Sequence, residues 1–191
     1  VLAPAARVAV IERDSTYEFA STLRASGGAR RQFSCPENIA MSNFSIPFIA
    51  TAGDTLAVDG EPAHVEWRAG GYLLIVGPDA VDTLRANCDA QRAHGVAADW
   101  LDADALRARF PSMSVHGIAA GVRTPDDGWC DPNGLLQGLR RKARSLDVDY
   151  IEANVVGIDH SERVARFVRL DTGVVVAGDY VVNAAGAWSK E

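Results

Sequence analysis

Apolar and polar positions along the first half of the chain predict a succession of strands and helices. Residues 7–12 (RVAVIE) form a short apolar run ending in an acid, which is typical of a strand buried on both faces of a parallel sheet. Pro36 opens a helical stretch that Pro47 should break or kink, and residues 51–62 are rich in turn formers. A second apolar run, Tyr72–Val76, lies between glycine-containing turns and predicts another strand.

The middle of the chain predicts a mixture of helices and strands. Apolar residues recur at helical spacing over residues 81–88, and Gly95 is a natural end for that helix. A further helix is expected over residues 102–110, with Asp102 as its N-cap and a proline after it, and residues 117–123 have a strand pattern. This part of the chain is therefore expected to be α+β.

The last third begins with a helix and continues with strands. Asp131 and Pro132 form a strong helix start, because an aspartate accepts the free amide protons while a proline in the first turn loses no useful donor. Five apolar residues then share one helix face: Leu135, Leu136, Leu139, Ala143 and Leu146. Strand patterns follow at residues 150–158, 163–170, 174–177 and 179–183, before a small-residue turn, NAAGAW.

Composition and charge exclude several classes of function. The net charge of −6 and the pI near 5.2 argue against nucleic acid and anionic membranes as partners. No apolar run approaches the roughly 18 residues of a membrane helix. The three cysteines and four histidines lack metal-ligand or disulfide spacing, so no metal site is expected. Unpaired cysteines suit a reducing compartment, which favours the cytoplasm, or the mitochondrial matrix if the protein is eukaryotic.

Glu12 is the first candidate for cofactor chemistry. In a dinucleotide-binding βαβ unit, the second strand ends in an acid that binds the adenosine ribose, about 20 residues after a glycine-rich GxGxxG turn. Only eleven residues precede Glu12, and the chain contains no GxGxxG. A solvated acid at a strand end remains the plainer interpretation of this position.

Three segments together carry a family resemblance: VAVIERD followed by ASTLRASGGARRQFS, then FPSMSV through TPDDGWCDPNGLLQGLRRKAR, then NVVGID with VVNAAGAWS. In order and spacing the chain resembles the D-amino-acid oxidase and sarcosine oxidase superfamily of FAD enzymes. The resemblance implies an α/β fold: an incomplete, Rossmann-like (glutathione-reductase-like) FAD-binding domain with an inserted α+β substrate domain. The expected boundaries are 1–62 and 126–191 for the FAD-binding parts and 63–125 for the substrate part.

The resemblance also assigns residues to FAD. It places Glu12 at the adenosine ribose, with Arg13 flanking the adenine end. The remaining cofactor residues lie in a loop under the flavin, on the adenine-side strand and at the second small-residue turn: Ser21, Ser26, Gly27, Gly28, Val155, Val156, Ala184, Ala185, Gly186 and Trp188. The glycines would let backbone approach the ligand. A buried strand is the plainer interpretation of Val155 and Val156, and a tight turn that of the segment from Ala184 to Trp188.

Arg30 is the candidate catalytic residue. In related enzymes a basic side chain at this point of the loop lies close to the flavin, where positive charge stabilises the anionic reduced ring. The alternative is that Arg30 and Arg31 are solvated loop charges. Asp126 and Asp127 are interpreted as turn residues, and Trp67, Trp100 and Trp129 as packing residues.

The implied function is oxidation of a C–N bond in a small amine or amino acid of the sarcosine, glycine or D-amino-acid type, with an unspecified electron acceptor. Two alternatives stay open. The first is an FAD dehydrogenase of a hydroxy acid or a respiratory-assembly flavoprotein. The second is a non-catalytic flavoprotein fragment that acts only as a folded or partner-bound module. Because the phosphate-binding turn precedes Glu12 in this fold, the 191 residues alone are not expected to hold FAD in a catalytic state. Further segments of the protein, or another chain, are expected to complete the sheet.

Overall fold

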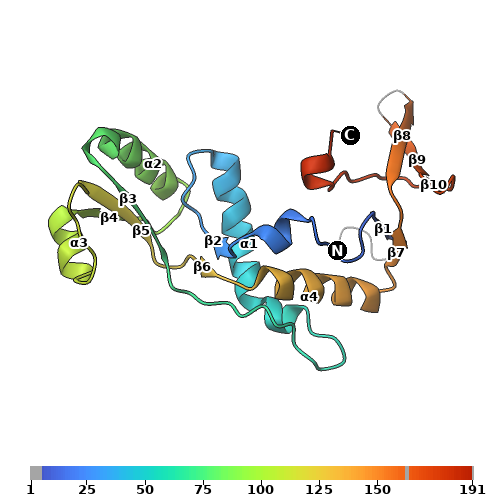
Figure 1. The fold of residues 1–191 in the computed structure, drawn as a ribbon, viewed down its shortest axis with the longest axis horizontal. Coiled ribbons are helices and arrows are strands. Elements are labelled where there is room, and N and C mark those ends of the chain that lie inside the picture. Colours follow the sequence, from blue (N-terminus) through green and yellow to red (C-terminus); the bar gives the residue numbers. More distant parts are fainter. Residues whose placement is uncertain (1–5, 162–163, 191) are drawn as a thin grey trace. The chain divides into compact units, whose positions relative to one another are not determined.

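The computed structural model describes residues 6–161 and 164–190, and the chain divides into two compact units. The terminal unit consists of residues 1–25 and 139–191, and the central unit is Ser26–Gly138 (Figure 1). Helix α4 (Pro132–Ser145) runs across the division. The fold belongs to the expected α/β class, whereas the boundaries 1–62, 63–125 and 126–191 stay predictions.

A three-stranded antiparallel sheet, in the order β3-β5-β4, organises one half of the central unit. Its elements are β3 (Tyr72–Val76), α2 (Val81–Ala93), β4 (Asp99–Asp102), α3 (Ala103–Arg109) and β5 (Ala120–Thr124). Leu84 and Cys88 of α2 pack with Val122 of β5 in a buried cluster. Asp102 caps α3 as predicted, because its Oδ1 accepts a hydrogen bond from the Ala105 amide at 2.8 Å.

Helix α1 (Pro36–Thr55) corrects the predicted break at Pro47. The helix continues through Pro47 for eight more residues, into the segment interpreted as turns. Ile46 and Ala52 are buried on either side of the proline. Their burial stabilises the helical path and offsets the backbone hydrogen bond that a proline cannot donate.

The second half of the central unit is built around a short antiparallel ribbon. Strand β2 (Gly28–Ala29) pairs with β6 (Gly128–Trp129), and Arg68 forms an isolated bridge with Trp129. A second cluster, with Leu56, Val65 and Cys130 at its centre, lies beneath α1. The ribbon holds the loop that follows β2 against the end of the β5–β6 turn.

Helix α4 begins as predicted, but its apolar face is only partly covered. Asp131 Oδ1 accepts a hydrogen bond from the Asn133 amide at 2.9 Å, so Asp131 acts as the expected cap. In the central unit Leu135 packs against the second cluster. Leu139 and Leu146, in the terminal unit, are 42% and 66% exposed.

The terminal unit contains a parallel pair of strands, β1 (Ala9–Glu12) and β7 (Asp149–Glu152), in which Glu12 and Glu152 are register partners. The parallel strand was predicted, but burial on both faces was not correct for the described residues. Ala9 is exposed, and the other three residues of β1 are half-buried. The predicted strand 150–158 is two strands, because Ala153 and Asn154 separate β7 from β8 (Val155–Ser161).

Strands β8, β9 (Val164–Leu170) and β10 (Val175–Ala177) form an antiparallel sheet. The predicted first residue of β9, Arg163, lies outside the described residues. The predicted strand 179–183 is wrong: within the described ranges, this segment pairs with no other strand. Tyr180 and Val182 are 92% and 85% exposed, although Val181 packs against the Ala153 cluster. Alternating side chains alone do not make a strand without a neighbour for the backbone groups.

Across residues 6–161 and 164–190, no helix has the length and apolarity needed to cross a bilayer.

Candidate functional site

The predicted site residues divide between the two units. Ser26, Gly27, Gly28 and Arg30 belong to the central unit. The others belong to the terminal unit: Glu12, Arg13, Ser21, Val155, Val156, Ala184, Ala185, Gly186 and Trp188.

Gly27 is required by the protein's own backbone. It has a φ of +82°, and a Cβ at this position would collide with the Cys130 carbonyl oxygen and the Trp129 indole. The Cys130 amide donates to the Gly27 carbonyl at 3.0 Å, so the two segments are hydrogen-bonded at this point. At Gly28 a Cβ would collide with the Tyr72 hydroxyl. The close approach observed at both glycines is therefore to protein atoms.

Replacing Gly27 by alanine should destabilise the central unit more than the same change at Gly60. Both glycines have positive φ, so both substitutions add backbone strain of about 1–3 kcal/mol. Only Gly27 would also drive its new methyl group into neighbouring atoms, since nothing lies within 4 Å of a Cβ at Gly60. We expect an additional loss of about 1–3 kcal/mol for Gly27→Ala, measured by urea unfolding of the full-length protein. Equal losses for the two variants would contradict this close contact.

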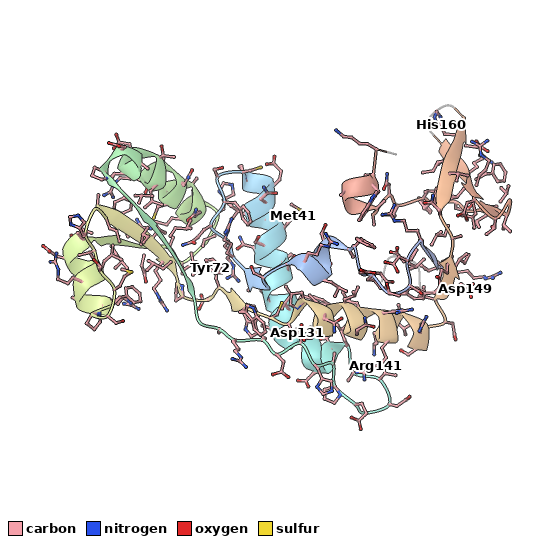
Figure 2. The ribbon with its side chains drawn as sticks, viewed as in Figure 1. Met41, Tyr72, Asp131, Arg141, Asp149 and His160 are labelled. Atoms are coloured by element: carbon pink, nitrogen blue, oxygen red, sulfur yellow. The ribbon has the colours of Figure 1, made fainter. Side chains whose placement is uncertain are left out.

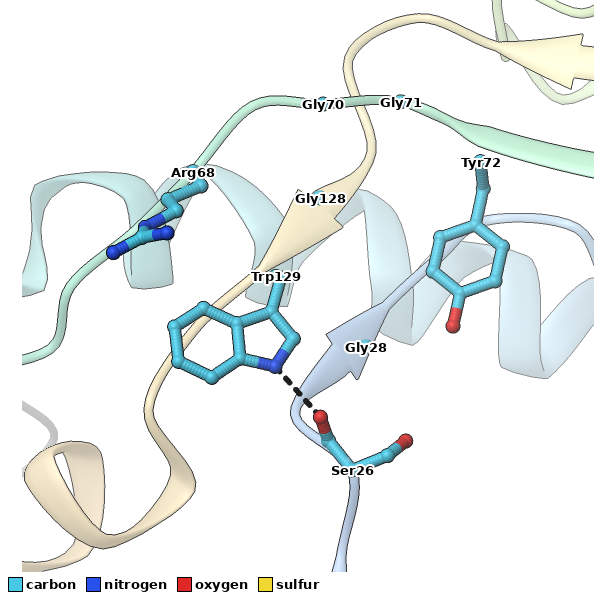
Figure 3. A pocket seen from close by; sticks show the side chains of 8 residues that line it. All are labelled: Ser26, Gly28, Arg68, Gly70, Gly71, Tyr72, Gly128 and Trp129. Carbon is cyan, nitrogen blue, oxygen red and sulfur yellow. Dashed lines mark hydrogen bonds between the residues drawn. The ribbon is translucent and has the colours of Figure 1, made fainter. Parts of the chain in front are cut away.

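Two hollows open beside the loop, and both are lined by Ser26, Gly28 and Tyr72. The first hollow has a volume of about 350 Å³ and is also lined by Arg68, Gly70, Gly71, Gly128 and Trp129. In Figure 3 the Tyr72 ring and the Trp129 indole lie on either side of Gly28, and the indole N–H donates to the Ser26 carbonyl at 2.7 Å. Figure 2 places Tyr72 at the start of β3.

The second hollow, of about 400 Å³, extends from the loop onto one side of α1. Its further lining residues are Ala29, Arg30, Phe33, Ser42, Ser45, Ile46 and Ile49. The four α1 residues have the i, i+3, i+4, i+7 spacing of a single helix face. Volumes of about 300–1,000 Å³ are typical of small-molecule sites.

The hollows are electropositive. The Arg30 guanidinium lies 5.3 Å from the Phe33 ring centre and 5.9 Å from that of Tyr72, and Arg68 lies 5.6 Å from the Trp129 ring. Within the described part of the chain, no acidic side chain lines either hollow. Burial raises the pKa of the neighbouring Cys130 thiol, which keeps it a neutral thiol rather than a nucleophile. The site therefore presents cations and aromatic rings.

Asp126 and Asp127 lie in the turn between β5 and β6, as interpreted, but Asp127 also makes an ion pair that the sequence did not predict. The Asp127 side chain is fully buried, and its Oδ1 lies 2.8 Å from Nη1 of Arg31, whose side chain is 14% exposed. Arg31 is consequently a buried, paired cation and not the solvated loop charge of the alternative interpretation. Arg30, its neighbour, is exposed at the second hollow.

In the terminal unit, the structure brings Arg13 and Trp188 together. The Arg13 guanidinium lies 4.0 Å from the Trp188 ring centre, a cation–π contact between two predicted cofactor residues. Glu12 ends β1 and is half-buried, and its Oε1 accepts from the Asp14 amide at 3.0 Å. The small-residue turn begins a 3-10 helix (Gly186–Trp188), and Gly186 has a φ of +57°.

The remaining terminal-unit candidates are solvent-exposed. Val155 and Val156 begin β8 and are 40% and 57% exposed, which contradicts the plainer interpretation of a buried strand there. Ser21 begins another 3-10 helix (Ser21–Arg24), and its side chain is exposed. Ala184 and Ala185 are exposed, and the Ala185 amide donates to Asn183 Oδ1 at 3.1 Å.

Sequence reasoning missed Tyr72, Arg68 and Trp129. Trp129 was interpreted as a packing residue, but it is 38% exposed and lines the first hollow. Trp67 and Trp100 do pack against the two central clusters as expected. The glycine beside Trp129 and the glycine pair before Tyr72 are the sequence signals that could have distinguished these residues from Trp67 and Trp100. Glycine has no side chain, so an aromatic ring can pack close to its backbone.

Comparison with known proteins places the chain in a class of flavoproteins. The "FAD dependent oxidoreductase" family model matches residues 2–191. A bovine protein, "FAD-dependent oxidoreductase domain-containing protein 1", is 34% identical, with 98% of this chain and 43% of that protein covered. The 4-methylaminobutanoate oxidase (formaldehyde-forming) of Paenarthrobacter nicotinovorans is 29% identical over 65% of this chain and 15% of that protein. The structure of glycine oxidase from Geobacillus kaustophilus superposes with a TM-score of 0.77 at 19% identity, covering 96% of this chain and 50% of that one.

The chain belongs to the FAD-dependent oxidoreductase family, as the resemblance implied, and the family's cofactor is FAD. It spans about 43% of the length of the bovine relative. The residues present fit the cofactor in each unit. Glu12 offers a carboxylate with acceptor capacity beyond its one bond to Asp14, as ribose hydroxyls need. The Arg30 side of the hollows offers a positive charge beside the Phe33 and Tyr72 rings.

Glu12→Ala in the full-length protein should weaken FAD binding by about 1–3 kcal/mol, the range for hydrogen bonds made by a charged group. Folding should suffer less, because Glu12 makes its bond at a half-exposed strand end. Titration of the apoprotein with FAD measures the effect. Glu152→Ala, at the register partner on β7, is the matched control and should leave the affinity unchanged. An unaltered affinity in Glu12→Ala would remove Glu12 from the cofactor residues.

Proposed function

We propose that the full-length protein oxidises the C–N bond of a small amine or amino acid, with the loop Ser26–Arg30 beside the flavin ring. Bound FAD would supply the redox chemistry, as the acceptor of a hydride from the carbon next to the amine nitrogen, and water would hydrolyse the resulting imine. One observation carries the proposal: the two hollows share the lining residues Ser26, Gly28 and Tyr72. Arg30 lines one hollow and Arg68 lines the other.

In this proposal Arg30 places a fixed positive charge where negative charge develops on the reduced cofactor. Its guanidinium lies 5.3 Å and 5.9 Å from the centres of two rings, Phe33 and Tyr72, and a charge placed before the reaction needs little reorganisation when the negative charge appears. The same rings and Ile46 contribute apolar surface to the lining of the second hollow. Arg68, on the Trp129 ring, is the cation that suits the carboxylate of an amino-acid substrate.

The relatives support an amine over a hydroxy acid, since two of them are an oxidase of 4-methylaminobutanoate and a glycine oxidase. Matched substrate pairs test the choice. The FAD-loaded, full-length protein is mixed anaerobically with glycine or N-methylglycine against glycolate, and with alanine against lactate. We expect only the amines to bleach the visible flavin absorption and to support turnover with an artificial acceptor. Bleaching by the hydroxy acids alone would contradict the proposal.

A non-catalytic chain gives a third outcome of the same experiment. It would show no bleaching with any substrate while a chemical reductant still reduced the bound flavin. Such a result would favour the folded or partner-bound module over both enzymes.

A further inference from the structure

Two adjacent arginines in the candidate site have opposite surroundings. Arg31 is paired with a fully buried carboxylate, and its Nε also donates to Asn43 Oδ1 at 3.1 Å. Arg30 is exposed and lies over the Phe33 and Tyr72 rings. Asp127 therefore neutralises one of the two charges and leaves the other at the hollow.

Asp127 ties together three segments that surround the hollows. Its Oδ2 accepts from the Arg31 amide at 2.9 Å and from the Thr124 hydroxyl at the end of β5, while its Oδ1 accepts from the Arg31 guanidinium. Its backbone carbonyl accepts from the Gly71 amide at 2.7 Å, one residue before Tyr72. One residue thus holds the arginine loop, the β5 end and the entry to β3.

The bond to the Arg31 amide acts directly on Arg30. That nitrogen belongs to the peptide plane that begins at the Arg30 carbonyl, and peptide planes are rigid. The Arg30 Cα lies in the same plane. Fixing this plane and the Arg31 side chain therefore restricts the position from which the Arg30 side chain extends. The bond is buried on the Asp127 side, where an unpaired partner would be costly.

We propose that Asp127 is a positioning residue that directs Arg30 to the hollow through the Arg31 amide and guanidinium. The inference rests on the proposed function, in which Arg30 stabilises the reduced flavin. Asp127 itself touches neither substrate nor cofactor in this role.

The flavin reduction potential distinguishes positioning from charge. Loss of a negative charge near the flavin would by itself raise the potential, since reduction adds negative charge to the ring. Loss of a correctly placed Arg30 would lower it. In the full-length, FAD-loaded protein we therefore expect Asp127→Asn to lower the potential and to slow flavin reduction about tenfold or more. In an Arg30→Met background, Asp127→Asn should no longer lower the potential and should change the rate less than about twofold, as residues acting as one unit are non-additive.

Asp126→Asn is the matched control, because it makes the same charge change at the exposed neighbour and leaves the ion pair of Asp127 with Arg31 in place, and it should not lower the flavin reduction potential. If Asp127→Asn does not fold, Thr124→Val removes one bond to the same carboxylate and keeps the ion pair, so a smaller fall in potential is expected. Two results would overturn the positioning role of Asp127 and leave the proposed function standing. One is a raised potential in Asp127→Asn. The other is an equal fall in potential when Asp127→Asn is made in the wild-type protein and in Arg30→Met. An unchanged potential in Arg30→Met overturns the proposed role of Arg30 and this inference together.

Discussion

Replacing Arg30 by methionine in the full-length, FAD-loaded protein is expected to slow reduction of the flavin by substrate about 100-fold, the size of effect seen when one fixed electrostatic stabiliser is removed. The flavin reduction potential should fall, because the charge favours the anionic reduced ring over the neutral oxidised one. FAD should stay bound, since Arg30 lies at the edge of a hollow lined by nine other residues. Anaerobic rapid mixing and a potentiometric titration measure the two effects.

Arg30→Lys separates charge from shape. Lysine keeps the positive charge but loses the planar group that lies over Phe33 and Tyr72, so only part of the rate and potential should return. An unaltered rate and potential in Arg30→Met would make Arg30 a solvated loop charge.

Asp127→Ala is expected to lower the free energy of unfolding by about 3–5 kcal/mol. It leaves the largely buried Arg31 guanidinium without its partner, and an uncompensated buried charge is costly. It also removes the acceptor for the Arg31 amide and the Thr124 hydroxyl. Urea unfolding of the full-length protein, followed by the fluorescence of the central unit's tryptophans, measures the loss.

A paired apolar replacement is the control for this prediction. Arg31→Met with Asp127→Leu removes both charges at once, and such replacements are often neutral compared with the broken pair. We expect the double variant to recover much of the stability lost in Asp127→Ala. A loss below about 1 kcal/mol for Asp127→Ala, the value of an exposed ion pair, would contradict the buried pairing.

The sequence predicted those elements whose signals are local. Strand β3 has the predicted bounds, Tyr72–Val76, because an apolar run between glycine-containing turns has few other solutions. The caps at Asp102 and Asp131 are local hydrogen bonds within three residues of each aspartate. A proline is also a local signal, yet Pro47 did not break α1, because burial of neighbouring residues outweighed it.

The site was predicted less completely because its contacts are distant in sequence. Arg31 and Asp127 are separated by 96 positions. Nothing close to Asp127 in the sequence therefore indicated that this turn residue is also the buried ion-pair partner of Arg31. The same holds for the indole of Trp129 and the Ser26 carbonyl, 103 positions apart. Family resemblance supplied Arg30 and the glycine loop, whereas Tyr72, Arg68 and Asp127 emerged only from the fold.

A crystal structure of the full-length protein with FAD bound would show directly where the flavin ring lies. We expect the ring to lie in van der Waals contact with the loop Ser26–Arg30, with the Arg30 guanidinium at the ring and Tyr72 lining the same space. A structure in which the flavin ring is bound elsewhere, with Arg30 and both hollows facing solvent, would contradict this expectation.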